Sequence, residues 1–420
     1  MVVLYRILLW LYRTGIRLAA LRSAKARQWV DGRRGQISAL RAWRATSSGP
    51  LLWMHCASLG EFEQGRPLLE AWRQRYPDYR ILLTFFSPSG YTVRQNYPEA
   101  DRVAYLPLDG KKRAAAFLGA VQPALAIFVK YEFWYFYLTG LRQRKITTLL
   151  IAATFRPRQP FFRWYGTLHR RMLTCFDQLF VQDKQSREIL AEYELPVTVA
   201  GDPRIDRVTA LPETAPRNPL IERFVGNHPV LIAGSVWPAD LTLLSGVAVD
   251  KRYADWRFIV APHEVHHFRG ADGRFRRPAF VDQHFPGGAA FYSQRDITAS
   301  TRVLLIDNIG LLNQLYRYAT VVYIGGGFGA GIHNTLEPMA FGKPVLFGGR
   351  FDRFPEAVYL DGFPATGKVV NAADLKRKLD YLLEDEAVYA QARERALAYL
   401  SAHAGATDRI LSWLHQRTAS

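Results

Sequence analysis

The sequence contains little cysteine and no long uncharged apolar run. Only two of its 420 residues are cysteines, Cys56 and Cys175, and both lie in apolar segments. This excludes a disulfide framework or a cysteine-based metal site and favours a reducing compartment. We therefore expect both thiols to be buried for structural reasons. The chain also has no Asp-x-Asp element, which carries a divalent ion in many sugar transferases.

Acidic residues are scarce relative to basic ones, and the formal net charge is +18. Such a balance is typical of proteins that meet nucleic acid, an anionic membrane or a phosphorylated substrate. Residues 1–45 hold ten Lys or Arg and one acid, Asp31. Modelling residues 1–20 as a helix puts Arg6, Arg13 and Arg17 on one side and most leucines elsewhere. This pattern predicts a basic amphipathic helix that lies at a membrane interface.

A transmembrane span needs about 20 mostly uncharged residues, and arginines interrupt this segment earlier. A cleaved signal peptide is also not expected, because Arg6 and Arg13 bracket only six residues and no small-residue cleavage site follows. We expect attachment to the membrane surface. The alternative is an ordinary basic helix packed on its own domain.

From Leu51 onwards short apolar runs alternate with helix-length amphipathic segments, which predicts βα units and parallel sheets. The proline-rich stretch near Pro212 and Pro219 indicates a linker. We predict an N-terminal segment (1–45), a first Rossmann-like domain (46–208), a linker (209–225) and a second Rossmann-like domain with C-terminal helices (226–420), with a ligand cleft between the domains. Expected strands are 51–55, 80–85, 102–106, 124–129, 147–152, 178–181 and 197–200, then 228–233, 256–260, 303–306, 321–324, 344–347 and 367–370.

The most informative segment runs from Leu51 to Gly65, a buried strand followed by Ser58-Leu59-Gly60-Glu61 at the start of a helix. Ligands of open α/β sheets lie beyond the carboxyl ends of the strands, where helix N-termini present free N–H groups. Glu61 is therefore a candidate to face a substrate. A Glu in a first turn can also merely complement the helix dipole.

Two further charged residues of the first half follow predicted strands. Glu132 is a lone acid among the aromatic residues of Tyr131-Glu132-Phe133-Trp134, where a buried carboxylate would be costly unless paired. It is therefore expected in a structural ion pair or in an active site. Arg204, in Gly201-Asp202-Pro203-Arg204, is placed to contact a charged sugar or phosphate.

In the second half, a strand at 321–324 leads into a run of glycines and then Asn334-Thr335-Leu336-Glu337 at a helix start. Glycines let the backbone approach a phosphate or sugar, and Glu337 is placed to accept hydrogen bonds from ribose hydroxyls. The spacing is not that of a Walker loop or dinucleotide fingerprint, and a simple tight turn is the alternative. Gly234-Ser235 is a candidate for a further phosphate contact.

Pro262-His263 follows another predicted strand, and three histidines fall within residues 263–267. Their spacing does not suit zinc, so we expect no metal and assign His263 to a phosphate or base contact. The stretch from Asp307 through Ile309, Gly310 and Leu311 also ends a strand, and its backbone N–H groups are candidates to hold a nucleotide. An Asp or Asn that merely caps the helix is an equally good local account.

Taken in order, these motifs resemble those of the Kdo transferases of lipopolysaccharide synthesis, over nearly the whole chain. The resemblance rests on Ser58 to Glu61, Tyr131 to Trp134, Gly201 to Asp206, Ala261 to His263, Ile309 to Leu311 and His333 to Glu337. It implies an inverting, metal-independent transferase of GT-B architecture that moves 3-deoxy-D-manno-octulosonic acid (Kdo) from CMP-Kdo to a lipid A precursor at the cytoplasmic face of the inner membrane. It implies no cofactor and no nucleic-acid partner.

The resemblance also implies roles for individual residues. Glu61 matches the catalytic base, and Glu132 and Arg204 match groups assigned to transition-state stabilisation. Acceptor contacts fall on Ser58 and Gly60. The CMP-binding positions are Pro262, His263, Ile309, Gly310, Leu311, Asn334, Thr335, Leu336 and Glu337, alongside the candidate phosphate contacts Gly234 and Ser235.

Three residues depart from the family pattern. Lys130 replaces an acid, His263 stands where arginine is usual, and Arg204 stands where lysine is usual, which keeps the charge but changes the hydrogen-bond geometry. Two other functions remain open. One is a GT-B transferase or epimerase that uses a UDP-sugar, and the other is a non-enzymatic protein that binds nucleic acid or membranes, for which the sequence shows no familiar nucleic-acid module.

Overall fold

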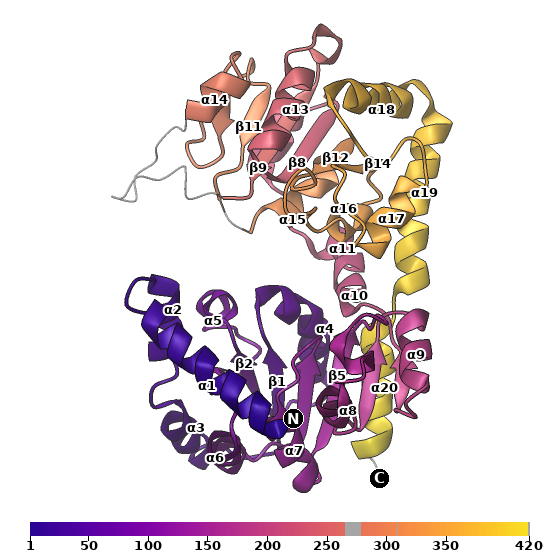
Figure 1. The fold of residues 1–420 in the computed structure, drawn as a ribbon. Helices are drawn as coiled ribbons and strands as arrows, with labels where there is room; N and C mark the ends of the chain where they lie inside the picture. Colours follow the sequence, from indigo (N-terminus) through magenta and orange to yellow (C-terminus); the bar gives the residue numbers. More distant parts are fainter. Residues whose placement is uncertain (265–278, 309, 419–420) are drawn as a thin grey trace. The chain divides into compact units, whose positions relative to one another are not determined.

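The computed structural model describes residues 1–264, 279–308 and 310–418. They form two units (Figure 1), one made of Met1–Asp206 with Ala404–Ser420 and the other of Arg207–His403. Each unit contains a seven-stranded sheet whose described pairings are all parallel. The predicted α/β class with two parallel sheets is therefore confirmed.

The sheet of the first unit has the order β3-β2-β1-β4-β5-β6-β7. Its strands are β1 (Leu51–Cys56), β2 (Arg80–Phe85), β3 (Arg102–Tyr105), β4 (Leu125–Val129), β5 (Thr147–Ala153), β6 (Gln178–Val181) and β7 (Val197–Val199). Its helices are α1 (Val2–Ala19), α2 (Ala24–Asp31), α3 (Gln36–Ala45), α4 (Leu59–Arg75), α5 (Pro88–Arg94), α6 (Lys111–Val121), α7 (Tyr135–Gln143), α8 (Thr167–Leu173), α9 (Lys184–Ala191) and α20 (Ala406–Thr418), with a short 3-10 helix at Pro160–Phe162.

Helices cover both faces of this sheet, as the unbroken apolar runs of its strands require. Successive side chains of a strand point to opposite faces, and β1 illustrates this. Trp53 packs in one core with residues of α3, α6 and α7, whereas Met54 packs in the other with residues of α4 and α20. Cys56 and Cys175 are both buried thiols, as expected.

The N-terminal segment folds onto the first unit as three helices, α1 to α3. Arg33, between α2 and α3, donates to the carbonyls of Leu106 at 2.9 Å and Phe86 at 2.5 Å and lies over the ring of Trp29. Burial lowers the pKa of Arg33 to about 9. All side chains of α1 keep some exposure to solvent. Among the described residues, no helix has the length and apolarity needed to cross a membrane.

The C-terminal helix α20 belongs to the first unit, whereas we had assigned it to the second domain. The preceding helix ends before Gly405, whose φ of +89° suits a residue without a side chain. Asp206 then accepts hydrogen bonds from the backbone N–H groups of Gly405 and Thr407, both at 2.6 Å. This carboxylate satisfies donors at the start of α20 and holds the helix against the first unit.

The sheet of the second unit has the order β10-β11-β9-β8-β12-β13-β14. Its strands are β8 (Val230–Val236), β9 (Arg257–Pro262), β10 (Ala290–Phe291), β11 (Val303–Leu305), β12 (Val321–Ile324), β13 (Val345–Phe347) and β14 (Gly367–Lys368). Its helices are α11 (Leu211–Thr214), α12 (Pro219–Val225), α13 (Pro238–Ala248), α14 (Ala279–His284), α15 (Leu312–Leu315), α16 (Leu336–Ala340), α17 (Pro355–Asp361), α18 (Ala372–Glu384) and α19 (Glu386–His403), with 3-10 helices at Lys251–Tyr253 and Tyr316–Tyr318; α10 (Pro203–Thr209) spans the boundary of the units.

Predicted and observed strands agree closely. Three expected ranges, 80–85, 178–181 and 321–324, match the observed strands at both ends. The two-residue strand β10 was not predicted, because so short a run gives no periodic signal. The expected linker 209–225 contains the helices α11 and α12, which begin at a leucine followed by Pro212 and at Pro219, respectively. Proline fits the first turn of a helix, so these prolines start helices.

Candidate active site

The candidate active site of the first unit lies at the point where its strand order reverses. β1 pairs with β4 at this point, although five other elements separate the two strands in sequence. In doubly wound sheets, ligands bind beyond the carboxyl ends of the strands at such a switch point. Glu61 follows β1 and Glu132 follows β4, so the fold places both predicted carboxylates at this position.

Glu61 lies in the first turn of α4. Ser58 is the extended residue before the helix, and the Oε2 atom of Glu61 accepts a hydrogen bond from the backbone N–H of Ala57 at 2.5 Å. The carboxylate therefore lies in the first turn, where it complements the helix dipole as the simpler interpretation of the sequence expects. The hydrogen bond from Ala57 also fixes the carboxylate at the end of β1.

The pKa of Glu61 is raised to about 7. Partial burial is the main cause, and the negative charge of Glu132 adds to it. Hydrogen bonds from the backbone of Ala57 and Ser58 and the positive charge of Lys130 act in the opposite direction. A carboxyl group with a pKa near 7 exchanges its proton readily at neutral pH, which suits a general base.

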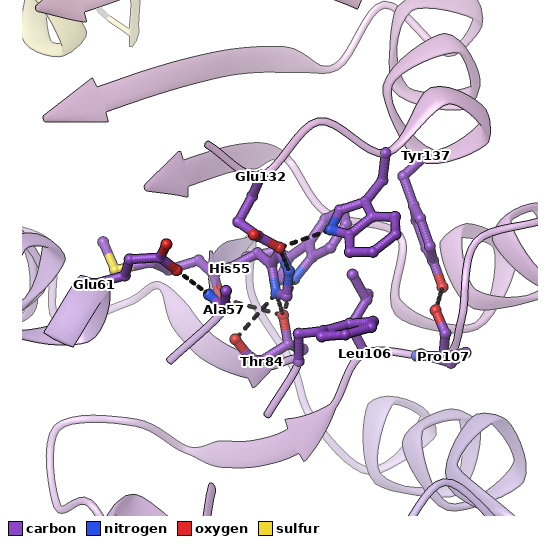
Figure 2. A network of polar contacts seen from close by, with 12 residues as sticks. His55, Ala57, Glu61, Thr84, Leu106, Pro107, Glu132 and Tyr137 are labelled. Atoms are coloured by element: carbon purple, nitrogen blue, oxygen red, sulfur yellow. Dashed lines mark hydrogen bonds and ion pairs between the residues drawn. The ribbon is translucent and has the colours of Figure 1, made fainter. Parts of the chain in front are cut away.

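Glu132 is buried and held by two hydrogen-bond donors (Figure 2). Its Oε2 atom lies 2.8 Å from Nε2 of His55 and accepts from Nε1 of Trp134 at 2.7 Å. His55 is fully buried near the carboxyl end of β1. Its Nδ1 atom lies 2.9 Å from Oγ1 of Thr84, which accepts in turn from the indole of Trp53 at 2.8 Å.

These contacts define a consistent set of protons. An ionised carboxylate can only accept, so His55 carries a proton on Nε2 and donates it to Glu132. Trp134 supplies the second donor. Two donors on a buried carboxylate stabilise its charged form, because hydrogen bonds to an ionised group offset the loss of water. Glu132 is therefore buried and paired, and its place in the active site stays a prediction.

Sequence analysis did not assign a role to His55. It lies inside the Leu51–Gly65 segment that we singled out, but its partner Glu132 is distant in sequence. The available signal was a lone imidazole in an otherwise apolar strand. Such a residue needs a polar partner when buried, and Glu132 was the lone acid expected to need one.

The N-terminal helices pack against the residues that surround Glu132. The ring of Trp134 stacks on Phe86 with centroids 4.9 Å apart, and Phe86 also contacts Trp29 of α2 and Tyr12 of α1. Arg33 lies over the Phe86 ring at 5.0 Å. Residues of the segment 1–45 therefore pack against Phe86, and Phe86 in turn stacks on the ring that donates to Glu132.

Of the other predicted residues of the first unit, Arg204 lies on a more distant strand end, and Ser58 and Gly60 lie beside Glu61. Arg204 follows β7, which lies three strands from β4 in the sheet. Its guanidinium binds the carboxylate of Asp202, with an Nη2 to Oδ2 distance of 2.5 Å. Gly60 is exposed, and a Cβ atom built on it would meet open space. Ser58 is partly exposed beside it.

In the second unit the predicted nucleotide-binding residues also gather at carboxyl ends of neighbouring strands. The strands β11, β9, β8 and β12 are neighbours in this order. Gly310 follows β11, Pro262 and His263 lie at the end of β9, Gly234 and Ser235 lie at the end of β8, and Asn334 follows β12. The rings of Trp237, His263 and His333 form a stack there, with centroids 4.6 Å and 4.4 Å apart. Trp237 Nε1 donates to Nε2 of His333 at 3.2 Å. Burial and the neighbouring His263 lower the pKa of His333.

The glycine run after β12 is required by packing. A Cβ atom on Gly325 would lie 2.5 Å from the carbonyl oxygen of Ser235, and one on Gly327 would meet the backbone of Gly348. Gly234 likewise leaves room for the hydroxyl of Tyr316. These contacts give a structural reason for glycine that is independent of any ligand.

Asp240, which sequence analysis did not single out, ties this region together. It is buried, and it accepts from the N–H groups of Trp237 at 2.8 Å and Gly326 at 3.0 Å and from the hydroxyl of Tyr323 at 2.7 Å. In the sequence it resembles any acid in a first helical turn. Its structural role is to fix the start of α13 to the glycine loop.

The remaining predicted positions fall around the short helices α15 and α16. Asn334 Oδ1 accepts from the N–H of Leu336 at 3.1 Å, Thr335 and Leu336 are buried, and Glu337 is half-buried. Gly310 is exposed with a φ of +85°, and Leu311 precedes α15. Ile309 lies outside the described residues. Within the part of the chain that is described, no three His, Cys, Asp or Glu side chains gather as a metal site would need.

Comparison with known proteins agrees with this geometry. Residues 29–207 match the family model of 3-deoxy-D-manno-octulosonic-acid transferase (kdotransferase). The chain is 26% identical over 364 residues to the transferase of that name from Chlamydia muridarum, covering 84% of this chain and 82% of that protein. It is 25% identical over 381 residues to the one from Haemophilus influenzae, covering 86% of both chains.

Solved structures with the same fold include a UDP-GlcNAc 2-epimerase from Neisseria meningitidis, with a TM-score of 0.60 at 15% identity, covering 87% of this chain and all of that one. A putative UDP-N-acetylglucosamine 2-epimerase from Listeria monocytogenes gives a TM-score of 0.59 at 15% identity, covering 89% of this chain and 97% of that one. At this identity the likeness concerns the fold alone.

The two parallel-sheet units and these structural neighbours show that the chain has a GT-B architecture. Its homologues indicate that it belongs to the class of glycosyltransferases. More specifically, the resemblance to the Kdo transferases is confirmed by the family model and by the relatives from several bacteria.

Proposed function

We propose that this protein transfers Kdo from CMP-Kdo to a lipid A precursor, with inversion at the anomeric carbon and without a metal ion. The names of its homologues support the sugar and the reaction class. The observation that carries the chemistry is Glu61, a carboxylate at the switch point of the first sheet with a pKa of about 7. Inversion and metal independence follow from a mechanism with a single displacement and one carboxylate base.

In this mechanism a hydroxyl oxygen of the acceptor attacks the anomeric carbon of Kdo. Its proton passes to the carboxylate of Glu61 as the new C–O bond forms. The bond between the anomeric carbon and the phosphate oxygen breaks, and CMP leaves with the electron pair. A base with a pKa near the working pH is efficient, because it is largely ionised yet still basic enough to take the proton.

Glu132 and Arg204 are proposed to stabilise charge in the transition state. Positive charge develops at the anomeric carbon, and an ionised Glu132, fixed by His55 and Trp134, is a preorganised countercharge. Arg204 is oriented by Asp202 and is suited to a carboxylate or phosphate of the substrates. Ser58 and the exposed Gly60 are proposed to contact the acceptor.

The strand ends of the second unit are proposed to bind CMP-Kdo. An imidazole N–H of His263 takes the place of the arginine that is usual in the family, and Trp237 and His333 hold its ring by stacking. The further contacts are proposed at Gly234, Ser235, Pro262, Ile309, Gly310, Leu311, Asn334, Thr335, Leu336 and Glu337. Donors fixed around the phosphate favour the transition state, because the leaving CMP gains charge.

We also propose that the protein is peripheral to the inner membrane at its cytoplasmic face. Support comes from α1, which combines Arg6, Arg13 and Arg17 with exposed apolar residues such as Leu8 and Trp10. Each cation close to an anionic leaflet contributes about 1 kcal/mol. Sedimentation with vesicles that contain or lack anionic lipid tests this attachment.

The decisive test of the reaction is CMP release from CMP-Kdo in the presence of a lipid A precursor. We expect Glu61→Gln to lower kcat by about 10²- to 10⁴-fold, because the base is removed while the side-chain shape is kept. Glu63→Gln, on the same helix, is the matched control, since Glu63 pairs with Arg94 at 2.7 Å. Undiminished turnover in Glu61→Gln would remove Glu61 as the base.

Calorimetry of nucleotide binding separates this proposal from a transferase or epimerase that uses a UDP-sugar. We expect CMP to bind more tightly than UDP. A preference for UDP would overturn the assigned donor, while leaving the architecture untouched. Mass spectrometry of the product from a defined acceptor then identifies the sugar transferred.

A further inference from the structure

An apolar groove runs beside α1 on the first unit. It has a volume of about 540 Å³, and its walls include Leu4, Leu8, Phe133, Phe161, Leu168 and Met172. One wall is the start of α1, the second is the loop around Glu132, and the third runs from the 3-10 helix Pro160–Phe162 to α8. Residues 1–28 lie outside the match to the family model.

Tyr5 fixes the start of α1 in place. Its hydroxyl donates to Oδ2 of Asp109 at 2.7 Å, and its ring packs against Tyr135 and Phe136. Burial raises the pKa of the Tyr5 hydroxyl, which keeps it a donor. Leu4 and Leu8 flank this anchor and are exposed although the helix itself is held. An apolar wall that is fixed yet uncovered is suited to an apolar ligand.

A second groove, on another part of α1, is strongly cationic. It has a volume of about 760 Å³, and its walls include Arg6, Arg13, Lys111, Lys112, Arg113 and Arg171. Asp109 also lines this groove, but its Oδ2 atom accepts from Tyr5 and from the backbone N–H of Phe136. The cations therefore greatly outnumber the acids on this surface, and the groove is complementary to an acidic group.

One helix thus borders both an apolar groove and a cationic groove. We propose that the apolar groove binds a fatty acyl chain of the lipid acceptor, while the cationic groove takes an acidic group of its headgroup. The acceptor is favoured over a bulk phospholipid because Tyr131 and Phe133, on either side of Glu132, both line the apolar groove. Tyr131 is fixed by its hydroxyl, which donates to the carbonyl of Thr154 at 2.9 Å. This inference rests on the proposed function.

The test compares acceptors that share one phosphorylated sugar headgroup and differ in their acyl chains, presented to the full-length protein in neutral detergent micelles. The variant is Leu4→Gln/Leu8→Gln, whose leucines are 52% and 55% exposed, so the fold does not depend on them. The matched control is Leu11→Gln/Leu18→Gln. Those leucines lie on the same helix, are 52% and 64% exposed, and do not line the groove.

We expect the Leu4/Leu8 variant to raise KM for the acylated acceptor by about tenfold or more, with kcat kept within about twofold. The control is expected to change KM by less than about twofold, and neither variant should change KM for the deacylated acceptor. In the wild type KM should rise as the chain is shortened, and in the Leu4/Leu8 variant this dependence should flatten.

Equal increases of KM in both double variants would overturn the proposal and indicate that α1 is a general membrane anchor that binds phospholipid. An unchanged dependence on chain length in the Leu4/Leu8 variant would also overturn it. Failure of the proposed function is a different result, namely no CMP release by the wild type with any of these acceptors.

Discussion

The two units place different chemistry at equivalent positions. At the switch point of the first sheet, Glu61 and Glu132 lie together, and the pKa of Glu61 rises to about 7. At the switch point of the second sheet, between β8 and β12, the acid is Asp240, whose two oxygens accept three hydrogen bonds from its own unit. A buried acid is therefore not by itself a catalytic group. An acid whose two oxygens both accept hydrogen bonds from its own unit has a structural role. An acid whose pKa is raised towards 7 is available for proton transfer.

The glycines of the two sites differ in packing, because Gly325 is enclosed by backbone atoms and Gly60 faces open space. Substituting alanine at each position should give the largest difference between the two units. We expect Gly325→Ala to lower the free energy of unfolding by about 3 kcal/mol, because its Cβ would lie 2.5 Å from the Ser235 carbonyl oxygen and 2.6 Å from the Val236 Cα. Gly60→Ala should change it by no more than about 0.5 kcal/mol, since that Cβ meets open space. Denaturant unfolding measures both, and a comparable loss in Gly60→Ala would show that the loop before Glu61 is packed as tightly as the glycine run.

The next test concerns the imidazole that holds Glu132 in place. We expect His55→Leu to lower kcat about 10- to 100-fold, because the buried Glu132 carboxylate would lose one of the two donors that orient it. His55→Gln retains an N–H donor and should recover part of the loss. A merely structural role for His55 would give equal losses of activity in the two variants, in step with their losses of stability.

Glu61 should also reduce stability at alkaline pH. Its folded pKa of about 7 lies above the value of about 4.3 in unfolded chains. The folded form therefore binds the proton more tightly, and this stabilisation is fully present below about pH 4 and is lost as the pH rises through about 7. We expect Glu61→Gln to be more stable than the wild type by about 1–2 kcal/mol at pH 8, with little gain at pH 5. Thermal unfolding at both pH values measures the difference, and an equal effect at both would contradict the raised pKa.

Local sequence patterns were sufficient to predict most of the fold. Alternating strand and helix periodicities located thirteen of the fourteen strands in the described part of the chain, because most of them are apolar runs bounded by turn residues. β10 is too short for such a pattern. The return of α20 to the first unit could not be predicted, since it depends on Asp206, a residue that is distant in sequence and accepts from Gly405 and Thr407.

The candidate site was predicted in part. Glu61 and Glu132 were identified because each follows a strand, and the parallel sheet brings the ends of neighbouring strands together. His55 and Asp240 were missed because their roles lie in contacts made across the sheet, His55 with Glu132 and Asp240 with Gly326 and Tyr323. The sequence shows which groups need partners, but the partners themselves follow from the strand order.

The smallest expected effect concerns the charges around Glu61, and it tests whether the first switch point tunes its base as described. The charge of Glu132 raises the pKa of Glu61, and the charge of Lys130, where the family usually has an acid, lowers it. In Glu132→Gln the alkaline rise of kcat/KM should therefore move to lower pH, and in Lys130→Met to higher pH, each by less than about one unit. Glu63→Gln, which alters the Arg94 ion pair on the same helix, should leave the midpoint in place. An unmoved midpoint in both variants would mean that burial alone sets the pKa of Glu61, and that the charge of Lys130 has no electrostatic role in the reaction.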